Sequence, residues 1–163
     1  MNDKILNSGF TLVEVMVSMA LLTTIFLLST ITLSNIIPTA SICATFEVLV
    51  SDMRLQQLKA MSGNTEGNDS VESYGVYFEQ DKYTLFRGFS YIASSSANFI
   101  VHLPKGVIFE DINLPASAIV FNQASGEVNA YDGNLDKVTV KSTVNNDEMT
   151  LELNKLGTIT TTE

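Results

Sequence analysis

The sequence contains few of the residues on which catalytic and metal sites depend. It has one cysteine, Cys43, and one histidine, His102. A single cysteine cannot form an internal disulfide, and one histidine cannot build a histidine-based metal cluster. There is also no glycine-rich phosphate loop and no paired-cysteine motif. We therefore expect no enzyme activity, no cofactor and no metal. Cys43 is interpreted as a small buried hydrophobe and His102 as a satisfied residue of an apolar strand.

Positive charge is scarce as well. The chain of 163 residues has 9 lysines and arginines against 18 aspartates and glutamates, which gives a formal net charge of -9. Such a balance argues against a surface that binds phosphate groups. We therefore expect that nucleic acid is not a partner of this protein.

Charge is absent altogether from a long stretch near the N-terminus. No charged residue occurs from Val15 to Phe46, and Val, Met, Leu and Ile dominate the part from Val15 to Ile37. About 20 such residues are enough to cross a bilayer as a helix. Glu14 stands directly before this run, where a carboxylate within a membrane helix costs roughly 2.5–3.5 kcal/mol. An acid in this position is a functional candidate whose partner needs to be identified.

The segment Gly9-Phe10-Thr11-Leu12-Val13-Glu14, followed by the apolar run, resembles the N-terminus of type IV prepilin-like proteins. The resemblance implies that residues 1–9 are a leader, which prepilin peptidase removes by cutting after Gly9. It also implies that Phe10 becomes the N-methylated first residue. Glu14 is then expected to pair with the N-terminal amine of a neighbouring subunit in the filament. An ordinary signal anchor is the alternative interpretation of the apolar segment.

The position of the apolar run also predicts the location of the protein. A secretory signal has its apolar core before the cleavage site, whereas here the core follows Gly9 and stays with the mature chain. Lys4 and the initial amine make the leader weakly basic, which places the N-terminus in the cytoplasm. We expect a single-pass protein of the cytoplasmic (inner) membrane with an extracytoplasmic C-terminal domain. Membrane lipid and an assembly platform in that membrane are its expected partners.

The helix is expected to continue beyond the membrane. Pro38 predicts a bend near Asn35–Pro38, so residues 10–37 form the transmembrane and filament-packing part and residues 38–62 an amphipathic continuation. Helical spacing predicts one apolar stripe on this second part, and its residues are Ile42, Phe46, Leu49, Val50, Met53 and Met61. The residues expected on the opposite face are Glu47, Ser51, Arg54 and Gln56. Ser62-Gly63-Asn64 is expected to end the helix, with glycine as a left-handed cap.

The remaining chain changes to strand periodicity. Residues 63–73 are predicted to be a linker because they are rich in Gly, Asn, Ser and acids. Residues 74–163 are predicted to form a β-rich globular domain of antiparallel strands, with two sheets favoured over one. The expected strands are Tyr74–Glu79, Lys82–Phe86, Phe99–Leu103, Val107–Asp111, Ala118–Asn122, Glu127–Tyr131, Lys137–Val144, Met149–Leu153 and Thr158–Thr161. The fold class is therefore α+β, a long N-terminal helix packed on a C-terminal antiparallel domain.

Two acidic loops are weak candidates for calcium, which takes six or more oxygen ligands. One contains Glu66, Asp69 and Glu72, and the other spans Asp132–Asp136. The first does not have the spacing of an EF-hand loop, so a solvated loop is the favoured interpretation of both.

The second half of the chain adds a finer resemblance. Leu49–Met61, Pro104-Lys105-Gly106-Val107, Ile119–Asn122 with Ser125–Val128, and Leu156–Ile159 together are similar to minor pilins and pseudopilins of the GspH/FimT type. This resemblance implies a structural subunit of a type IV pilus or of a type II secretion pseudopilus, with other pilin or pseudopilin subunits as partners.

The alternative is a binding module displayed on the fibre, such as an adhesin or a DNA-uptake receptor. Some FimT-like proteins carry an arginine-rich C-terminal surface, whereas the segment from Leu153 to Glu163 has only Lys155. A binding module needs a basic groove or an aromatic ridge. The one such cluster contains Phe86, Arg87, Phe89 and Tyr91, which are interpreted as buried strand residues.

Overall fold

The structure is a computed structural model that describes residues 10–63, 65 and 71–162, with the side chains of residues 29–40 and 161–162 left out. The chain forms two compact units, Met1–Ile37 and Pro38–Glu163. The predicted leader, residues 1–9, lies outside the described residues, as do Glu66 and Asp69.

The helix α1 covers Leu12–Met61. It ends where the sequence predicts, because Gly63 adopts a left-handed backbone with φ 65° that a residue with a Cβ rarely takes. The N–H of Ser62 donates to the carbonyl of Leu58 at 2.9 Å and so completes the last turn. Helical backbone runs through Pro38. The bend expected near Asn35–Pro38 falls where side chains are not described, and it stays a prediction.

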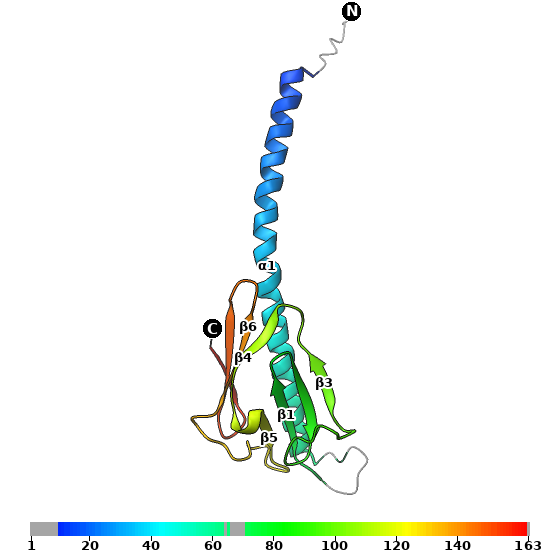
Figure 1. The fold of residues 1–163 in the computed structure, drawn as a ribbon, viewed down its shortest axis with the longest axis vertical. Helices are drawn as coiled ribbons and strands as arrows, with labels where there is room; N and C mark the ends of the chain where they lie inside the picture. Colours follow the sequence, from blue (N-terminus) through cyan, green and yellow to red (C-terminus); the bar gives the residue numbers. More distant parts are fainter. Residues whose placement is uncertain (1–9, 64, 66–70, 163) are drawn as a thin grey trace, which may run out of the picture. The chain divides into compact units, whose positions relative to one another are not determined.

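Among the residues that the structure describes, eight strands follow the helix, with one 3₁₀ turn, η1 (Pro115–Ser117), before β5. The strands are β1 Tyr74–Glu79, β2 Lys82–Arg87, β3 Phe99–His102, β4 Val107–Asn113, β5 Ala118–Phe121, β6 Lys137–Ser142, β7 Glu148–Leu153 and β8 Ile159–Thr162. They form two four-stranded antiparallel sheets, ordered β3-β2-β1-β5 and β4-β6-β7-β8 (Figure 1). The α+β class and the two antiparallel sheets are thus confirmed.

One of the expected strands is wrong, and one turn between strands crosses from the first sheet to the second. The turn at Pro104–Gly106 exists, with the N–H of Val107 donating to the carbonyl of Pro104 at 3.1 Å. However, it carries the chain from β3 in one sheet to β4 in the other, because β3 pairs with β2 and β4 with β6. The segment expected as a strand at Glu127–Tyr131 forms only a single bridge, between Phe121 and Val128.

The core of the second unit lies between the end of α1 and the two sheets. Ile42, Phe46, Leu49 and Met53 are buried as predicted. They pack in one cluster with side chains from both sheets, among them Val76, Phe78, Tyr83, Phe109, Val138 and Leu151. The second half of the helix is therefore the central element on which both sheets assemble.

The end of the apolar stripe differs from the prediction. Gln56 is only 3% exposed and Ala60 is fully buried, whereas Met61 is 51% exposed. Spacings of four, three and four residues place a set of side chains on one face of the helix: Leu49, Met53, Gln56 and Ala60. The prediction chose Met61 for the stripe because it is hydrophobic, and it placed Gln56 on the opposite face. The helical repeat instead puts Gln56 in the buried stripe.

Candidate functional site

The N-terminal site residues lie at the start of α1. Gly9 is outside the described residues, Phe10 is 83% exposed, and helical backbone begins at Leu12. Glu14 falls in the first helical turn and is also exposed. The described residues therefore place Phe10 and Glu14 near one helix end with both side chains open to a partner.

Thr11 caps this end of the helix. Its Oγ1 accepts a hydrogen bond from the Glu14 N–H at 3.2 Å, and its carbonyl accepts one from the Val15 N–H at 3.2 Å. Threonine followed three residues later by glutamate is the sequence of a capping box. The pattern Thr-x-x-Glu in residues 11–14 is the sequence signal by which this cap could have been predicted. A carboxylate in the first turn is also favoured by the helix dipole.

The described helix after Glu14 presents an almost purely apolar surface. Large apolar side chains are exposed along it, among them Val15, Met19, Leu22, Phe26 and Leu28. The polar residues are satisfied internally, since Ser18 Oγ donates to the carbonyl of Glu14 at 2.7 Å and Thr23 Oγ1 to that of Met19 at 2.7 Å. Such back-bonding leaves few unsatisfied polar groups on the helix.

A bilayer crossing requires a long run of apolar helix, and among the described residues no helix meets that requirement.

Two interpretations of single residues are corrected. Cys43 is a free and exposed thiol, because its position on α1 is one residue past buried Ile42 and outside the stripe facing the sheets. His102 is exposed at the end of β3. β3 is the edge strand of its sheet. Its apolar sequence therefore does not place His102 in a buried environment.

The acidic loops show no metal site within the described residues. Glu72 pairs with Arg87 at 3.1 Å. In the second loop the carboxylate of Asp132 accepts hydrogen bonds from the N–H and the side-chain amide of Asn134 at 3.0 and 3.1 Å. Glu72 and Asp132 therefore bind neighbouring side chains and backbone of their own chain.

The aromatic cluster is only partly buried. Phe86 is 2% exposed and packs edge-on against Tyr91, while Phe89 is 64% exposed. Tyr91 also stacks on Tyr77 with ring centroids 4.0 Å apart. The interpretation as buried strand residues is right for Phe86 and wrong for Phe89, which lies after the end of β2.

Comparison with known proteins supports the N-terminal motif. Residues 6–30 match the family model of the prokaryotic N-terminal methylation motif. No curated protein and no solved structure matches the chain. The match includes Gly9, Phe10 and Glu14 and ends within the apolar helix. Residues 6–30 therefore carry a type IV prepilin-like signal, and this signal indicates a pilin-like protein.

Proposed function

We propose that this chain is a structural subunit, of the minor type, in a type IV pilus or a type II secretion pseudopilus. The methylation motif at residues 6–30 is the observation that carries the proposal. Prepilin peptidase cuts between Gly9 and Phe10, and Phe10 is then methylated. The helix of residues 10–37 holds the subunit in the inner membrane, with residues 38–163 on the extracytoplasmic side, until an assembly platform draws it into the fibre.

The apolar helix surface supports this role. Side chains such as Leu12, Val13 and Met16 are 64–76% exposed, and a soluble protein rarely leaves so much contiguous apolar surface uncovered. Lipid covers it before assembly, and the helices of neighbouring subunits cover it in the fibre. A carboxylate drawn into that interior needs a positive partner. We assign this partnership to Glu14 and the amine of Phe10 in an adjacent subunit.

The described surface gives little support to the alternative of a DNA receptor. Lys82, Arg87 and Lys137 pair with carboxylates at 3.1–3.4 Å. Lys141 contacts two acids, Glu110 and Glu148, at 2.6 and 2.8 Å. These pairs neutralise cations that a phosphate backbone would otherwise attract.

Mass analysis of the N-terminus tests the processing step. Protein is extracted from membranes of cells that contain prepilin peptidase and of matched cells that lack it. We expect a mature chain that starts at methylated Phe10 in the first sample and an intact Met1 in the second. Gly9→Val is the control that blocks cleavage at the site itself. An intact Met1 in both samples, or a cut elsewhere, contradicts the proposal.

A further inference from the structure

A cavity of about 270 Å³ lies on the side of the sheet β3-β2-β1-β5 that faces away from the core. Tyr77 on β1 is the register partner of Ala118 on β5, and Val120 is two residues farther along β5, so these three side chains point to the same side. Their neighbours in sequence, Val76 and Ile119, point the other way, into the core. The loop after β2 and the segments before and after β5 supply further lining residues, which include Phe89, Ser90, Tyr91, Ala116, Asn129 and Ala130.

Stacked tyrosines form one wall of the cavity. The ring centroids of Tyr77 and Tyr91 are 4.0 Å apart and the ring planes differ by 8°. Phe86 packs edge-on against Tyr91 with the centroids 5.7 Å apart, so two ring contacts hold Tyr91 in place. Phe89 lines the same cavity and is 64% exposed, and none of the described rings stacks on it. The cavity therefore has a fixed aromatic wall and one further ring that is open to a ligand.

Two alanines with unusual backbone conformations also line the cavity. Ala116 and Ala130 have φ values of 51° and 50°, in the left-handed region that residues with a Cβ rarely adopt. Such strained positions persist only where the surrounding structure holds them, and they cluster at ligand sites. The methyl side chains of these residues take up little of the space between the two loops and the sheet.

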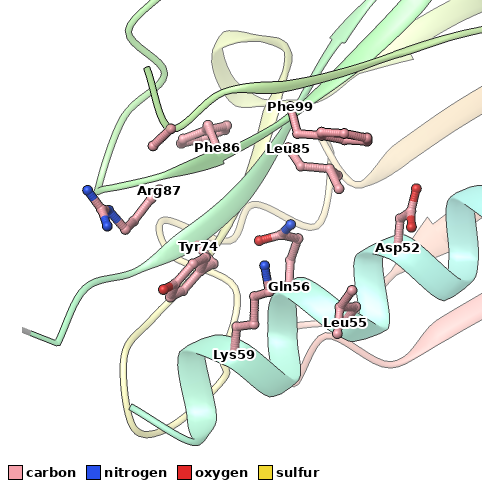
Figure 2. Close-up of a pocket in the computed structure, with 10 residues that line it drawn as sticks. Asp52, Leu55, Gln56, Lys59, Tyr74, Leu85, Phe86, Arg87 and Phe99 are labelled. Carbon is pink, nitrogen blue, oxygen red and sulfur yellow. The ribbon is translucent and has the colours of Figure 1, made fainter. Parts of the chain in front are cut away.

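Among the described residues, none that lines this cavity is charged. By contrast, the cavity of about 380 Å³ between α1 and strands β2 and β3, which Gln56 lines, also has Asp52, Lys59 and Arg87 in its lining (Figure 2). A charged ligand that enters an uncharged cavity loses water and gains no ion pair. The ligand that suits the cavity of Tyr77 and Phe89 is therefore neutral.

Neutral polar groups accompany the aromatic rings. Ser90 and Asn129 line the cavity and are exposed. None of the described residues hydrogen-bonds to either side chain, or to the hydroxyls of Tyr77 and Tyr91. Hydroxyl and amide side chains both donate and accept hydrogen bonds. A ligand with several hydroxyl groups matches this set.

We propose that this cavity binds one neutral sugar ring of a glycan. One face of a pyranose ring consists mainly of C–H groups and packs on an aromatic side chain, here that of Phe89. Its hydroxyls bond the side chains of Ser90 and Asn129. The volume is below the roughly 300–1,000 Å³ of pockets that enclose a drug-sized ligand, as a site for a single sugar ring requires. This site goes beyond the filament role proposed above and does not depend on it.

The tyrosine wall distinguishes a sugar from two other ligands of aromatic sites. A quaternary ammonium group needs rings that surround a common space, and a proline-rich segment needs a groove between rings. Tyr77 and Tyr91 lie face to face, so nothing fits between their rings. The lining also offers no carboxylate to a cation.

The test measures equilibrium binding of labelled oligosaccharides to the full chain. A polyoxyethylene detergent is used, because a glucoside or maltoside headgroup would compete for the site. The probes are short neutral oligomers of glucose, galactose, mannose and N-acetylglucosamine, with an oligomer of galacturonic acid, choline and a polyproline peptide as controls. We expect at least one neutral oligomer to bind saturably with a Kd below about 1 mM. The galacturonic acid oligomer should bind at least about tenfold more weakly than that probe, because its carboxylates find no partner and the chain has a net charge of -9.

Variants of the chain locate the interaction. Phe89→Ala and Asn129→Ala remove exposed side chains and should each weaken binding of the neutral probe at least about fivefold. Phe99→Ala is the matched control, since Phe99 is 65% exposed and lies outside this cavity, and it should bind like the parent. Thermal unfolding of each variant verifies that it is folded.

Four results would each overturn the proposal. The first is that no neutral oligomer binds saturably, and the second is that galacturonic acid, choline or polyproline binds as tightly as the best neutral probe. The third is that Phe89→Ala or Asn129→Ala binds like the parent. The fourth is that Phe99→Ala loses binding to the same extent as Phe89→Ala.

Discussion

The hydroxyl of Tyr83 on β2 donates a 2.6 Å hydrogen bond to Oδ2 of Asp52 on α1. This bond joins the helix to the sheet at the margin of the core. Burial, and then the hydrogen bond and the negative charge of Asp52, raise the pKa of Tyr83 far above its ordinary value of 10.0. The phenol is therefore protonated in the folded protein under all ordinary conditions.

Replacing this hydroxyl should destabilise the domain. We expect Tyr83→Phe to lower the free energy of unfolding by about 1 kcal/mol near neutral pH. Because the folded-state pKa is raised, the contribution of the phenol is complete below its unfolded pKa and is lost as the pH rises above that value. The difference between parent and variant should therefore shrink in alkaline solution. Denaturant unfolding at neutral pH and above pH 10 checks this, and a difference that grows with pH contradicts it.

A second pH effect should appear on the acid side. Hydrogen bonding to Lys141, and then its positive charge, lowers the pKa of Glu148. A lowered folded-state pKa means that the stabilisation is present above the unfolded pKa and is lost as the pH falls through the folded value. We expect Lys141→Gln to be less stable than the parent at neutral pH and nearly equal to it in strong acid. Lys105→Gln, an exposed lysine in the turn before β4, is the matched control and should behave like the parent throughout.

The charge of Glu14 can be separated by substitution from its place in the Thr-x-x-Glu sequence of the helix cap. Glutamine can replace glutamate in a capping box but carries no charge. If pairing with a neighbouring amine drives assembly, Glu14→Gln and Glu14→Val should both be cut after Gly9 and reach the membrane, and both should be depleted from filaments at least about tenfold. Immunoblots of membrane and sheared-filament fractions measure this. Normal incorporation of Glu14→Gln would show that the helix cap, and not the charge, is what assembly requires.

The net charge of -9 predicts weak or absent binding of duplex DNA. Titration of labelled duplex with the full chain in detergent at physiological salt should show no saturation below about 100 μM. Replacing Glu110 and Glu148 by glutamine releases Lys141 from its two acids and provides a variant with a less negative surface. Sub-micromolar binding by the parent chain, with a steep dependence on salt, would overturn this expectation.

The sequence predicted local structure well, but it did not indicate which strands share a sheet. The strand at Tyr74–Glu79 was predicted with its observed bounds because alternation and a tight turn are local properties. Whether the turn at Pro104–Gly106 joins neighbours in one sheet or crosses to the other depends on packing between distant strands. Gln56 shows a similar limit, since a buried glutamine at the base of a cavity has no hydrophobic signature.

The N-terminal motif could be recognised because it depends only on residues that are adjacent in the sequence. Its meaning lies in a contiguous run of residues that begins at Gly9 and Phe10, and the match over residues 6–30 supports it. The roles of the individual residues involve a peptidase, a methyl group and a neighbouring subunit. These roles depend on other molecules, so they follow neither from the hydrophobic periodicity of the sequence nor from the structure of one chain.

The end of α1 depends on parts of the chain that are far away in sequence. Nε2 of Gln57 donates to the carbonyls of Gly126 and Leu156, each at 2.9 Å, across 69 and 99 residues. Contacts of such long range form slowly because a large loop must close first. As the chain is made from its N-terminus, the helix end exists well before these acceptors do. The domain can therefore close around the helix only late, and until then the apolar stripe of the helix needs protection from aggregation.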